Sequence, residues 1–363
     1  MNFVKKILVI KLRHHGDVLL STALFNALAE LFPHAKVDAV VYSETTPLLL
    51  NNPHVHKVLR INRALKGVAR LKTELALIRT IRANGYDAVI HLTDQWIGAL
   101  IAAASQAPIR VEMAFQKRNN ALWHACFTHR IAQPPRGQAH AVELNLLCLQ
   151  ALGVNPSNIQ GKMVLVPSPE HLEHARTLLS QAHISGPFVL VHPAARWPFK
   201  CWEDESFARV IAHVLRKGFH VVLTCSPDPI ELEMTRRMEQ LARQYAQPSH
   251  SGVLLNKGGE MSLPLLTALL TFSQFYIGVD SAPMHMAAAL DVPQVALFGP
   301  SWVNEWRPWS SKATVIYAGD YGPLPHPDSI NTDDPTRLLK AIPLDAVIQA
   351  VDAMLNTYPA QPA

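Results

Sequence analysis

Three short segments of the chain carry side chains that could do chemistry. The first is Arg13–Asp17 (RHHGD), in which Gly16 permits an unusual backbone geometry. Asp17 could accept a proton from a hydroxyl nucleophile. The alternative is that Asp17 only caps the free N–H groups of the helix that follows, and its position alone favours this cap. The segment has no GxGxxG pattern, which argues against a dinucleotide-dependent oxidoreductase.

The second segment is His192–Trp202 (HPAARWPFKCW), which follows an apolar run. Arg196 and Lys200 place two cations there. Together with backbone N–H groups at the start of a helix, these cations would form an anion site, typically for a phosphate. The alternative is that both cations are simply solvated.

The third segment is Gly278–Ala289 (GVDSAPMHMAAA). Ser281 and the first turn of a following helix can meet an anion, and His285 can donate a hydrogen bond. Asp280 could orient the loop or accept a hydrogen bond from a sugar hydroxyl. The alternative is an aspartate cap beside a core histidine.

These segments lie between predicted strands and helices of a parallel sheet. The strands are expected at Lys6–Leu12, Val37–Tyr42, Asp87–Leu92, Phe188–His192, His220–Cys225, Phe275–Val279 and Gln294–Phe298. The helices are expected at Val18–Leu31, Val68–Ala83, Glu203–Arg216, Pro229–Arg243, Pro283–Leu290 and Leu344–Leu355. Apolar strands that alternate with helices indicate an α/β fold. Ligands of such sheets bind beyond the carboxyl ends of the strands, where all three segments lie.

Length and composition indicate two folded domains. The chain has 363 residues, of which 49% are hydrophobic and 17% charged, so it is not disordered. A proline-rich stretch, Asn155–Pro187, marks the boundary between two doubly wound domains. No run reaches the roughly 18 apolar residues of a membrane span, and Ile7–Ile10 is too short for an export signal. We therefore expect a cytoplasmic protein.

Charge is distributed unevenly along the chain. Residues 1–150 contain 18 Lys and Arg and 9 Asp and Glu, a net charge of +9, whereas the remainder has 15 and 19, a net of −4. The basic half should face something anionic, which could be nucleic acid, a membrane surface or a phosphorylated substrate. The four cysteines form no CxxC pair, so neither a disulfide framework nor a structural zinc site is expected.

Taken together, Lys11–Asp17, His192–Trp202 and Gly278–Ala289, with Phe298–Pro300 behind them, resemble glycosyltransferase family 9, the ADP-heptose:lipopolysaccharide heptosyltransferases. Within the family the chain is most similar to the type III members, which add the branching heptose of the inner core. The resemblance implies a GT-B fold of two facing Rossmann-like domains. It places an acceptor domain at 1–160, a donor domain at 161–340 and a terminal helix, within 341–363, that packs back on the first domain.

The resemblance also implies roles for individual residues in an inverting, single-displacement transfer of L-glycero-D-manno-heptose from ADP-heptose. Asp17 matches the catalytic base and Lys200 the lysine that neutralises the donor phosphates. The residues expected to bind the donor are Gly16, Ala194, Arg196, Ser226, Glu231, Asp280, Ser281, Ala282 and His285. No DxD-type metal motif lies in these segments, so no metal and no cofactor is expected. Relatives often have hydroxyl residues where Ala194 and Ala195 stand, and glycine at Ala282.

The resemblance implies what the basic half of the chain could bind. Between Lys57 and Arg82, eight Lys and Arg accompany a lone Glu74. They could bind the phosphates and acidic sugars of the lipopolysaccharide core, or the anionic lipids of the inner membrane's cytoplasmic face. The alternative is a solvated helix face. Nucleic acid is disfavoured because this stretch has no aromatic residue on which bases could stack. Arg60, Arg63 and His140 are the expected acceptor-binding residues.

Two other functions stay open at this stage. One is a sibling heptosyltransferase, of type I or II, that acts at another position or with another sugar. The other is a catalytically inactive protein that binds core oligosaccharide. The presence of both Asp17 and Lys200 favours an active enzyme.

Overall fold

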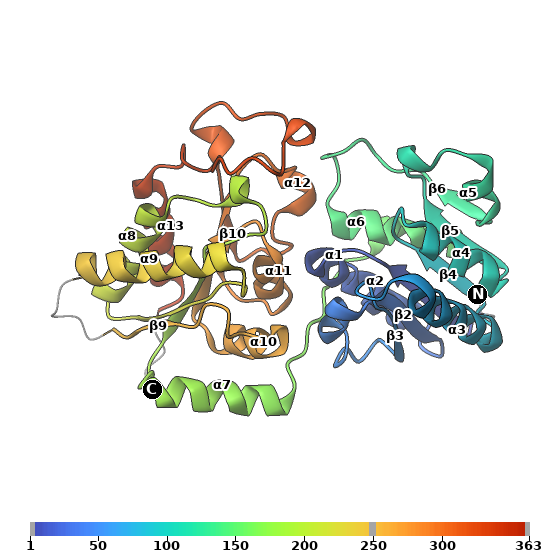
Figure 1. Ribbon diagram of the computed structural model, residues 1–363, viewed down its shortest axis with the longest axis horizontal. Helices are drawn as coiled ribbons and strands as arrows, with labels where there is room; N and C mark the ends of the chain where they lie inside the picture. The colour runs from blue at the N-terminus through green and yellow to red at the C-terminus, as the bar shows by residue number, and fades with distance from the viewer. Residues whose placement is uncertain (1–3, 247–251, 360–363) are drawn as a thin grey trace. The chain divides into compact units, whose positions relative to one another are not determined.

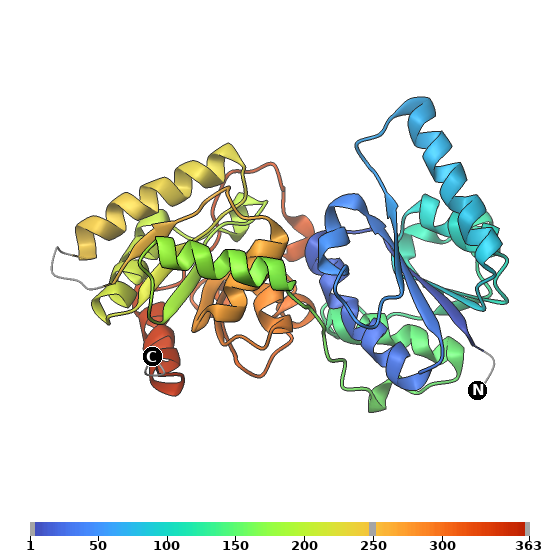
Figure 2. The ribbon, with the colours of Figure 1, turned by 90° about the horizontal axis from the view of Figure 1, so that it is seen from below.

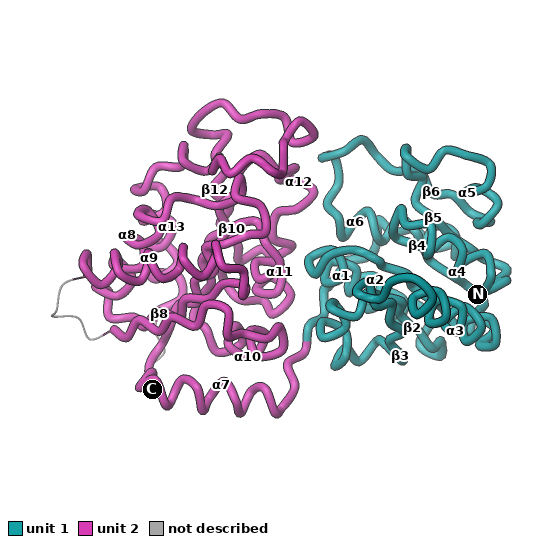
Figure 3. The backbone as a smooth tube through the Cα atoms, in the orientation of Figure 1, with its two compact units in different colours: residues 1–165 teal, residues 166–363 magenta. Residues whose placement is uncertain are grey.

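The structure of the chain is a computed structural model that describes residues 4–246 and 252–359. The chain forms two compact units, Met1–Leu165 and Val166–Ala363, shown in teal and magenta in Figure 3. They divide close to the boundary expected at 160/161. Each unit holds one six-stranded parallel sheet with helices around it (Figure 1).

In unit 1 the sheet has the strand order β3-β2-β1-β4-β5-β6. Its strands are β1 (Lys6–Lys11), β2 (Lys36–Tyr42), β3 (Lys57–Ile61), β4 (Ala88–His91), β5 (Ile109–Met113) and β6 (His129–Ile131). Its helices are α1 (His15–Leu20), α2 (Thr22–Leu31), α3 (Gly67–Asn84), α4 (Trp96–Ser105), α5 (Ala121–Ala125) and α6 (Ala141–Leu146). The central strand β1 is buried at every residue after Lys6, as expected for a parallel strand covered on both faces.

In unit 2 the sheet has the order β12-β11-β10-β7-β8-β9. Its strands are β7 (Phe188–His192), β8 (His220–Leu223), β9 (Leu254–Asn256), β10 (Phe275–Val279), β11 (Gln294–Phe298) and β12 (Ala313–Tyr317). Its helices are α7 (Pro169–Gln181), α8 (Asp204–Arg216), α9 (Pro229–Ala246), α10 (Leu263–Phe272), α11 (Ala282–Ala289), α12 (Val303–Trp306) and α13 (Leu344–Thr357). Its large core includes Trp202, Phe207 and Phe275, all fully buried.

The two sheets share one topology. Counted within its own unit, each sheet runs 3-2-1-4-5-6, the order of a Rossmann fold. The strand order reverses between β1 and β4 in unit 1 and between β7 and β10 in unit 2. Ligands of such sheets bind beyond the carboxyl ends of the strands at this switch point. The loops that follow β1, β4, β7 and β10 are therefore the first places to look for a site.

The terminal helix α13 packs within unit 2. Its main contacts are with α8, β11 and β12 of that unit, and the expected packing on the first domain stays a prediction. Val347 and Val351 are fully buried in the unit 2 core, and His213 on α8 lies 2.8 Å from Asp352 Oδ1. The apolar face of α13 therefore completes the second domain.

Two local expectations differ from the structure. The helix expected at Val18–Leu31 is two helices, α1 and α2, which meet at Ser21, whose hydroxyl donates to the carbonyl of Val18. The proline-rich stretch expected to mark the domain boundary also contains α7, because Ser168 caps this helix and Pro169 occupies its first turn. Among the described residues, no helix is long and apolar enough to span a membrane.

Candidate functional sites at the switch points of the two sheets

Asp17 lies in the loop region that follows β1, in the first turn of α1. The N-cap of α1 is His14, and its side chain makes no capping hydrogen bond. The interpretation of Asp17 as the helix cap is therefore wrong. Gly16 is an ordinary residue of the same turn and is not among the glycines with positive φ, so the unusual geometry expected for it is also wrong.

A buried lysine accompanies Asp17. Lys11 ends β1, and its Nζ lies 3.7 Å from Asp17 Oδ1. The same ammonium donates to the carbonyl of Leu92 and to Asn145 Oδ1, each at 3.4 Å. Burial lowers the pKa of Lys11, while the negative charge of Asp17 acts in the opposite direction. Sequence reasoning missed Lys11 and Asn145, although a lysine at the end of a buried strand was a signal.

The Asp17 loop is connected to the basic part of unit 1. His15 Nε2 lies 3.2 Å from the carbonyl oxygen of Glu44, and the carboxylate of Glu44 pairs with Arg63. The Arg63 guanidinium also lies 4.2 Å above the ring centroid of Tyr42. Arg63 is thus held near the carboxyl ends of the strands, while Arg60 lies exposed on β3. The structure therefore places one of the two expected acceptor arginines beside the Asp17 loop.

His140 has a structural role at the start of α6. Its Nδ1 accepts from the backbone N–H of Val142, and the Glu143 carboxylate accepts from the backbone N–H of His140, which together form a capping box for α6. Only 2% of His140 is exposed. The capping box accounts for both residues, and a role of His140 toward an acceptor stays a prediction.

In unit 2, three strand-end loops converge on one carboxylate. Lys200, in a 3₁₀ turn (Pro198–Lys200) after β7, places its Nζ 2.5 Å from Asp280 Oδ2, which follows β10. Ser301, after β11, donates to the same oxygen at 2.7 Å. Burial by itself favours the neutral acid, but the Lys200 ammonium and these hydrogen bonds hold the pKa of Asp280 below its usual value. The result is a buried ion pair at the switch point.

The remaining donor residues surround this ion pair. Ser281 is the N-cap of α11 without a side-chain capping bond, and Ala282 begins the helix, with His285 buried one turn further on. Asp280 is therefore not the helix cap of the alternative interpretation. Ala194 is fully buried. Arg196 is exposed, with its guanidinium 5.8 Å from the Trp197 ring centroid.

The loop after β8 is ordered by its own carboxylates. Glu231 accepts a hydrogen bond from the backbone N–H of Ser226 at 2.9 Å, and Asp228 accepts one from Ile230 at 2.9 Å. Both bonds tie the loop to the first turn of α9. The Ser226–Glu231 loop thus lies beside the Lys200 loop, since β8 is the neighbour of β7. Contact with a nucleoside stays a prediction.

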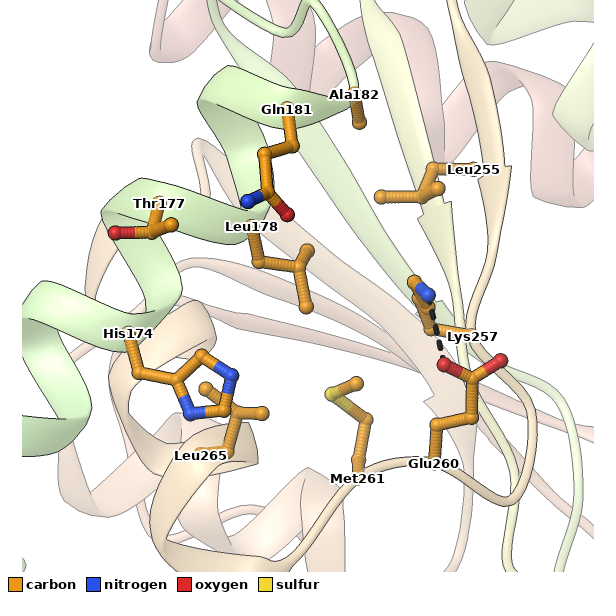
Figure 4. A pocket seen from close by; sticks show the side chains of 10 residues that line it. All are labelled: His174, Thr177, Leu178, Gln181, Ala182, Leu255, Lys257, Glu260, Met261 and Leu265. Carbon is orange, nitrogen blue, oxygen red and sulfur yellow. Dashed lines mark hydrogen bonds and ion pairs between the residues drawn. The ribbon is translucent and has the colours of Figure 1, made fainter.

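A cavity of about 460 Å³ lies in unit 2 away from these loops. Figure 4 shows the side chains that line it, which come from α7, from β9 and the loop after it, and from α10. Lys257 and Glu260 form an ion pair of 2.7 Å at its edge. None of the predicted site residues lines this cavity. Among the described residues, no group of three or more His, Cys, Asp or Glu side chains could hold a metal ion.

Comparisons with known proteins show which family the chain is similar to. The profile of glycosyltransferase family 9 (heptosyltransferase) matches residues 74–334. Lipopolysaccharide heptosyltransferase 3 of Escherichia coli is 34% identical over 345 residues, which cover 95% of this chain and 97% of that protein.

Two solved structures share the fold. A glycosyl transferase family 9 protein from Veillonella parvula DSM 2008 superimposes with a TM-score of 0.82 at 23% identity, over 98% of this chain and 99% of that one. The E. coli ADP-heptose lps heptosyltransferase II gives a TM-score of 0.74 at 22% identity, over 97% and 99%. These matches confirm the α/β fold that the resemblance implied. From the profile and the full-length relative, the chain belongs to glycosyltransferase family 9, the heptosyltransferases.

Proposed function

We propose that this glycosyltransferase moves L-glycero-D-manno-heptose from ADP-heptose to the heptose region of the lipopolysaccharide inner core, as a type III enzyme. The observation that carries the proposal is the similarity to lipopolysaccharide heptosyltransferase 3 over nearly the full length of both chains. Unit 1 would bind the acceptor and unit 2 the donor. Asp17 at one switch point and Lys200 at the other provide a base and a cation for the reaction.

The transfer is a single displacement with inversion. The acceptor hydroxyl oxygen attacks the anomeric carbon of the heptose while the bond from that carbon to the ADP oxygen breaks. The hydroxyl proton passes to the Asp17 carboxylate, and ADP leaves with the bonding electrons. A positioned carboxylate contributes typically about 10²–10⁴-fold to such a step. The buried Lys11 ammonium, 3.7 Å away, holds this carboxylate in place.

The leaving ADP gains negative charge, and groups of unit 2 can stabilise this charge. Lys200 and the N-terminal end of α11 lie at the same strand ends, and fixed cations and helix N–H groups stabilise developing charge. In the structure Lys200 pairs with Asp280. A donor phosphate would share the ammonium with that carboxylate. With alanines at 194 and 195, the phosphates depend on Lys200, Ser281 and backbone groups.

The acceptor is anchored in a membrane, so the enzyme should work at the cytoplasmic face of the inner membrane. Arg60 and Arg63, at the edge of the unit 1 sheet, are our candidates for the phosphates and acidic sugars of the core. Arginine suits this task because its planar guanidinium binds phosphate and carboxylate groups in a bidentate manner.

The test is a transfer assay with purified protein, ADP-heptose and core acceptors from strains that lack defined heptoses. Transfer of one heptosyl unit to the acceptor that lacks only the branching heptose, seen by mass spectrometry, is the expected result. Transfer only to an acceptor that lacks an earlier heptose would instead identify a type I or II sibling. Donor binding without hydrolysis or transfer on any acceptor would identify a binding protein.

A further inference from the structure

Helix α3 exposes a row of large apolar side chains. Val68, Leu71 and Leu75 are 68%, 57% and 44% exposed. Their spacing of three and four residues places them on one face of the helix. The packed part of the helix comes later: Ile81 is buried in the unit 1 core, and Leu77 and Ile78 are partly buried against it. We call Val68, Leu71 and Leu75 the apolar stripe.

The apolar stripe occupies the part of α3 that unit 1 does not cover. In Figure 2 the first turns of this light blue helix stand clear of the sheet of unit 1, and only its later turns approach the other helices. A row of uncovered leucines on a helix costs free energy in water, so such a surface marks an interaction site.

Cations surround the apolar stripe. The exposed cations on and beside α3 are Lys66, Arg70, Lys72, Arg79 and Arg82. The acid within this stretch is Glu74, and Arg70 donates to it at 2.7 Å. Lys72 comes four residues after Val68 and Arg79 four residues after Leu75, so both cations lie on the same side of the helix as the apolar stripe. An apolar stripe between cations is typical of helices that lie in the plane of an anionic membrane surface.

We propose that α3 docks this enzyme onto anionic lipid, with Val68, Leu71 and Leu75 inserted at the boundary between headgroups and acyl chains. The inference deepens the proposed function, whose acceptor is membrane-anchored, but the binding itself needs no donor or acceptor. The positive charge around the apolar stripe indicates whether a second copy of the chain or a lipid surface covers it. Symmetric pairing with a second copy would bring two sets of the same cations together, which opposes association. Each Lys or Arg near an anionic bilayer, by contrast, adds attraction.

The test compares leucine-to-serine substitutions within α3 with the same substitution at an exposed leucine outside α3. Vesicles of 30% phosphatidylglycerol and 70% phosphatidylethanolamine are sedimented with wild-type protein, with Leu71→Ser, with the double variant Leu71→Ser/Leu75→Ser, and with Leu50→Ser. Leu50 is a matched control because it is 63% exposed in the same unit but lies outside α3. We expect the double variant to bind about tenfold more weakly or worse, and Leu50→Ser to bind like wild type. Phosphatidylcholine vesicles or high salt should weaken wild-type binding, because the cations need an anionic surface.

Transfer activity separates lipid binding from the chemistry. The double variant should act on delipidated core acceptor at the wild-type rate and lose activity only with acceptor embedded in vesicles. Equal thermal unfolding temperatures would show that the variants fold. Equal vesicle binding by wild type and the double variant would overturn the proposal, as would a wild-type dimer that the double variant disrupts. If the wild-type protein binds vesicles but transfers no heptose, the docking proposal is supported and the proposed function is overturned.

Discussion

Lys11 Nζ lies 3.7 Å from Asp17 Oδ1, and the two side chains meet between the end of β1 and the first turn of α1. The lysine is nearly buried, with 10% of its side chain exposed, and the aspartate is 21% exposed. A buried cation next to a partly open carboxylate fixes the direction in which that carboxylate points. Lys11 is therefore expected to be a positioning residue for the proposed base.

Replacing Lys11 by methionine tests this relationship. Lys11→Met should lower turnover about ten- to a hundredfold, because a base displaced by about 1 Å loses this much. The KM for ADP-heptose should stay at the wild-type value, because Lys11 lies in unit 1 and the expected donor residues other than Gly16 lie in unit 2. Lys6→Met is the matched control, because Lys6 begins the same strand but is exposed at its other end. A folded Lys11→Met variant with the turnover of wild type would leave Lys11 a purely structural residue.

Asp17→Asn tests the base itself. The variant should fold and bind ADP-heptose like wild type, because the expected donor residues other than Gly16 lie in unit 2. Its transfer rate should fall about 10²–10⁴-fold, the usual effect of losing a general base. Calorimetric titration with donor and a transfer assay measure the two quantities. Wild-type transfer by folded Asp17→Asn would remove the residue from the mechanism.

Much of the fold could be predicted because its central strands are apolar throughout. Phe188–His192, Phe275–Val279 and Gln294–Phe298 have the predicted bounds, and every residue in them is buried. The edge strands β6 and β9 were missed because each has only three residues, too few for a periodic signal. Helix α7 was missed because the prolines of Asn155–Pro187 were interpreted only as the sign of a domain boundary.

The candidate sites could be located from the sequence, but their pairings could not. Loops after strands were identified because parallel sheets bind ligands there. The ion pair of Lys200 with Asp280 joins residues 80 positions apart, and Lys11 reaches Asn145 across 134 positions. No spacing rule relates residues at such distances. The strand order, which sets β7 beside β10, brings Lys200 to Asp280, and the packing of α6 on α1 and α2 brings Asn145 to Lys11.

Lys200→Ala should impair both stability and donor use. Removing one partner of a buried ion pair typically costs about 3–5 kcal/mol, and here Asp280 would stay behind, buried. The double variant Lys200→Ala/Asp280→Asn should recover most of the stability. It should not recover donor affinity, since the ammonium for the phosphates is still absent. Urea unfolding and the KM for ADP-heptose report the two effects. Recovery of both by the double variant would mean that Lys200 serves the fold alone.

The same ion pair predicts a dependence of stability on pH. The pKa of Asp280 is lower in the folded chain than in the unfolded chain, where a value of about 3.9 is usual. Its contribution is therefore fully present above about pH 3.9 and is lost as the pH falls through the lower folded value. Between these values wild type should lose more stability than Lys200→Ala/Asp280→Asn does. Parallel acid unfolding curves of the two proteins would contradict this.

Arg60 and Arg63 should act on the acceptor alone. Changing both to glutamate should raise the KM for phosphorylated core acceptor, and it should hardly change the KM for ADP-heptose. Arg63→Glu alone should give much of the effect, because the new carboxylate would face Glu44, the present partner of Arg63, beside the Asp17 loop. Added salt should mimic part of the defect, since exposed charges are screened beyond about 8 Å at physiological ionic strength.

Delipidated acceptor distinguishes these arginines from the apolar stripe of α3. The Arg60/Arg63 variant should fail on it, whereas Leu71→Ser/Leu75→Ser should not, because the arginines would bind the sugar phosphates and the stripe the lipid. If the arginine variant works normally on delipidated core and fails only on vesicles, the whole basic surface serves the membrane. The acceptor phosphates must then be held by other groups of unit 1.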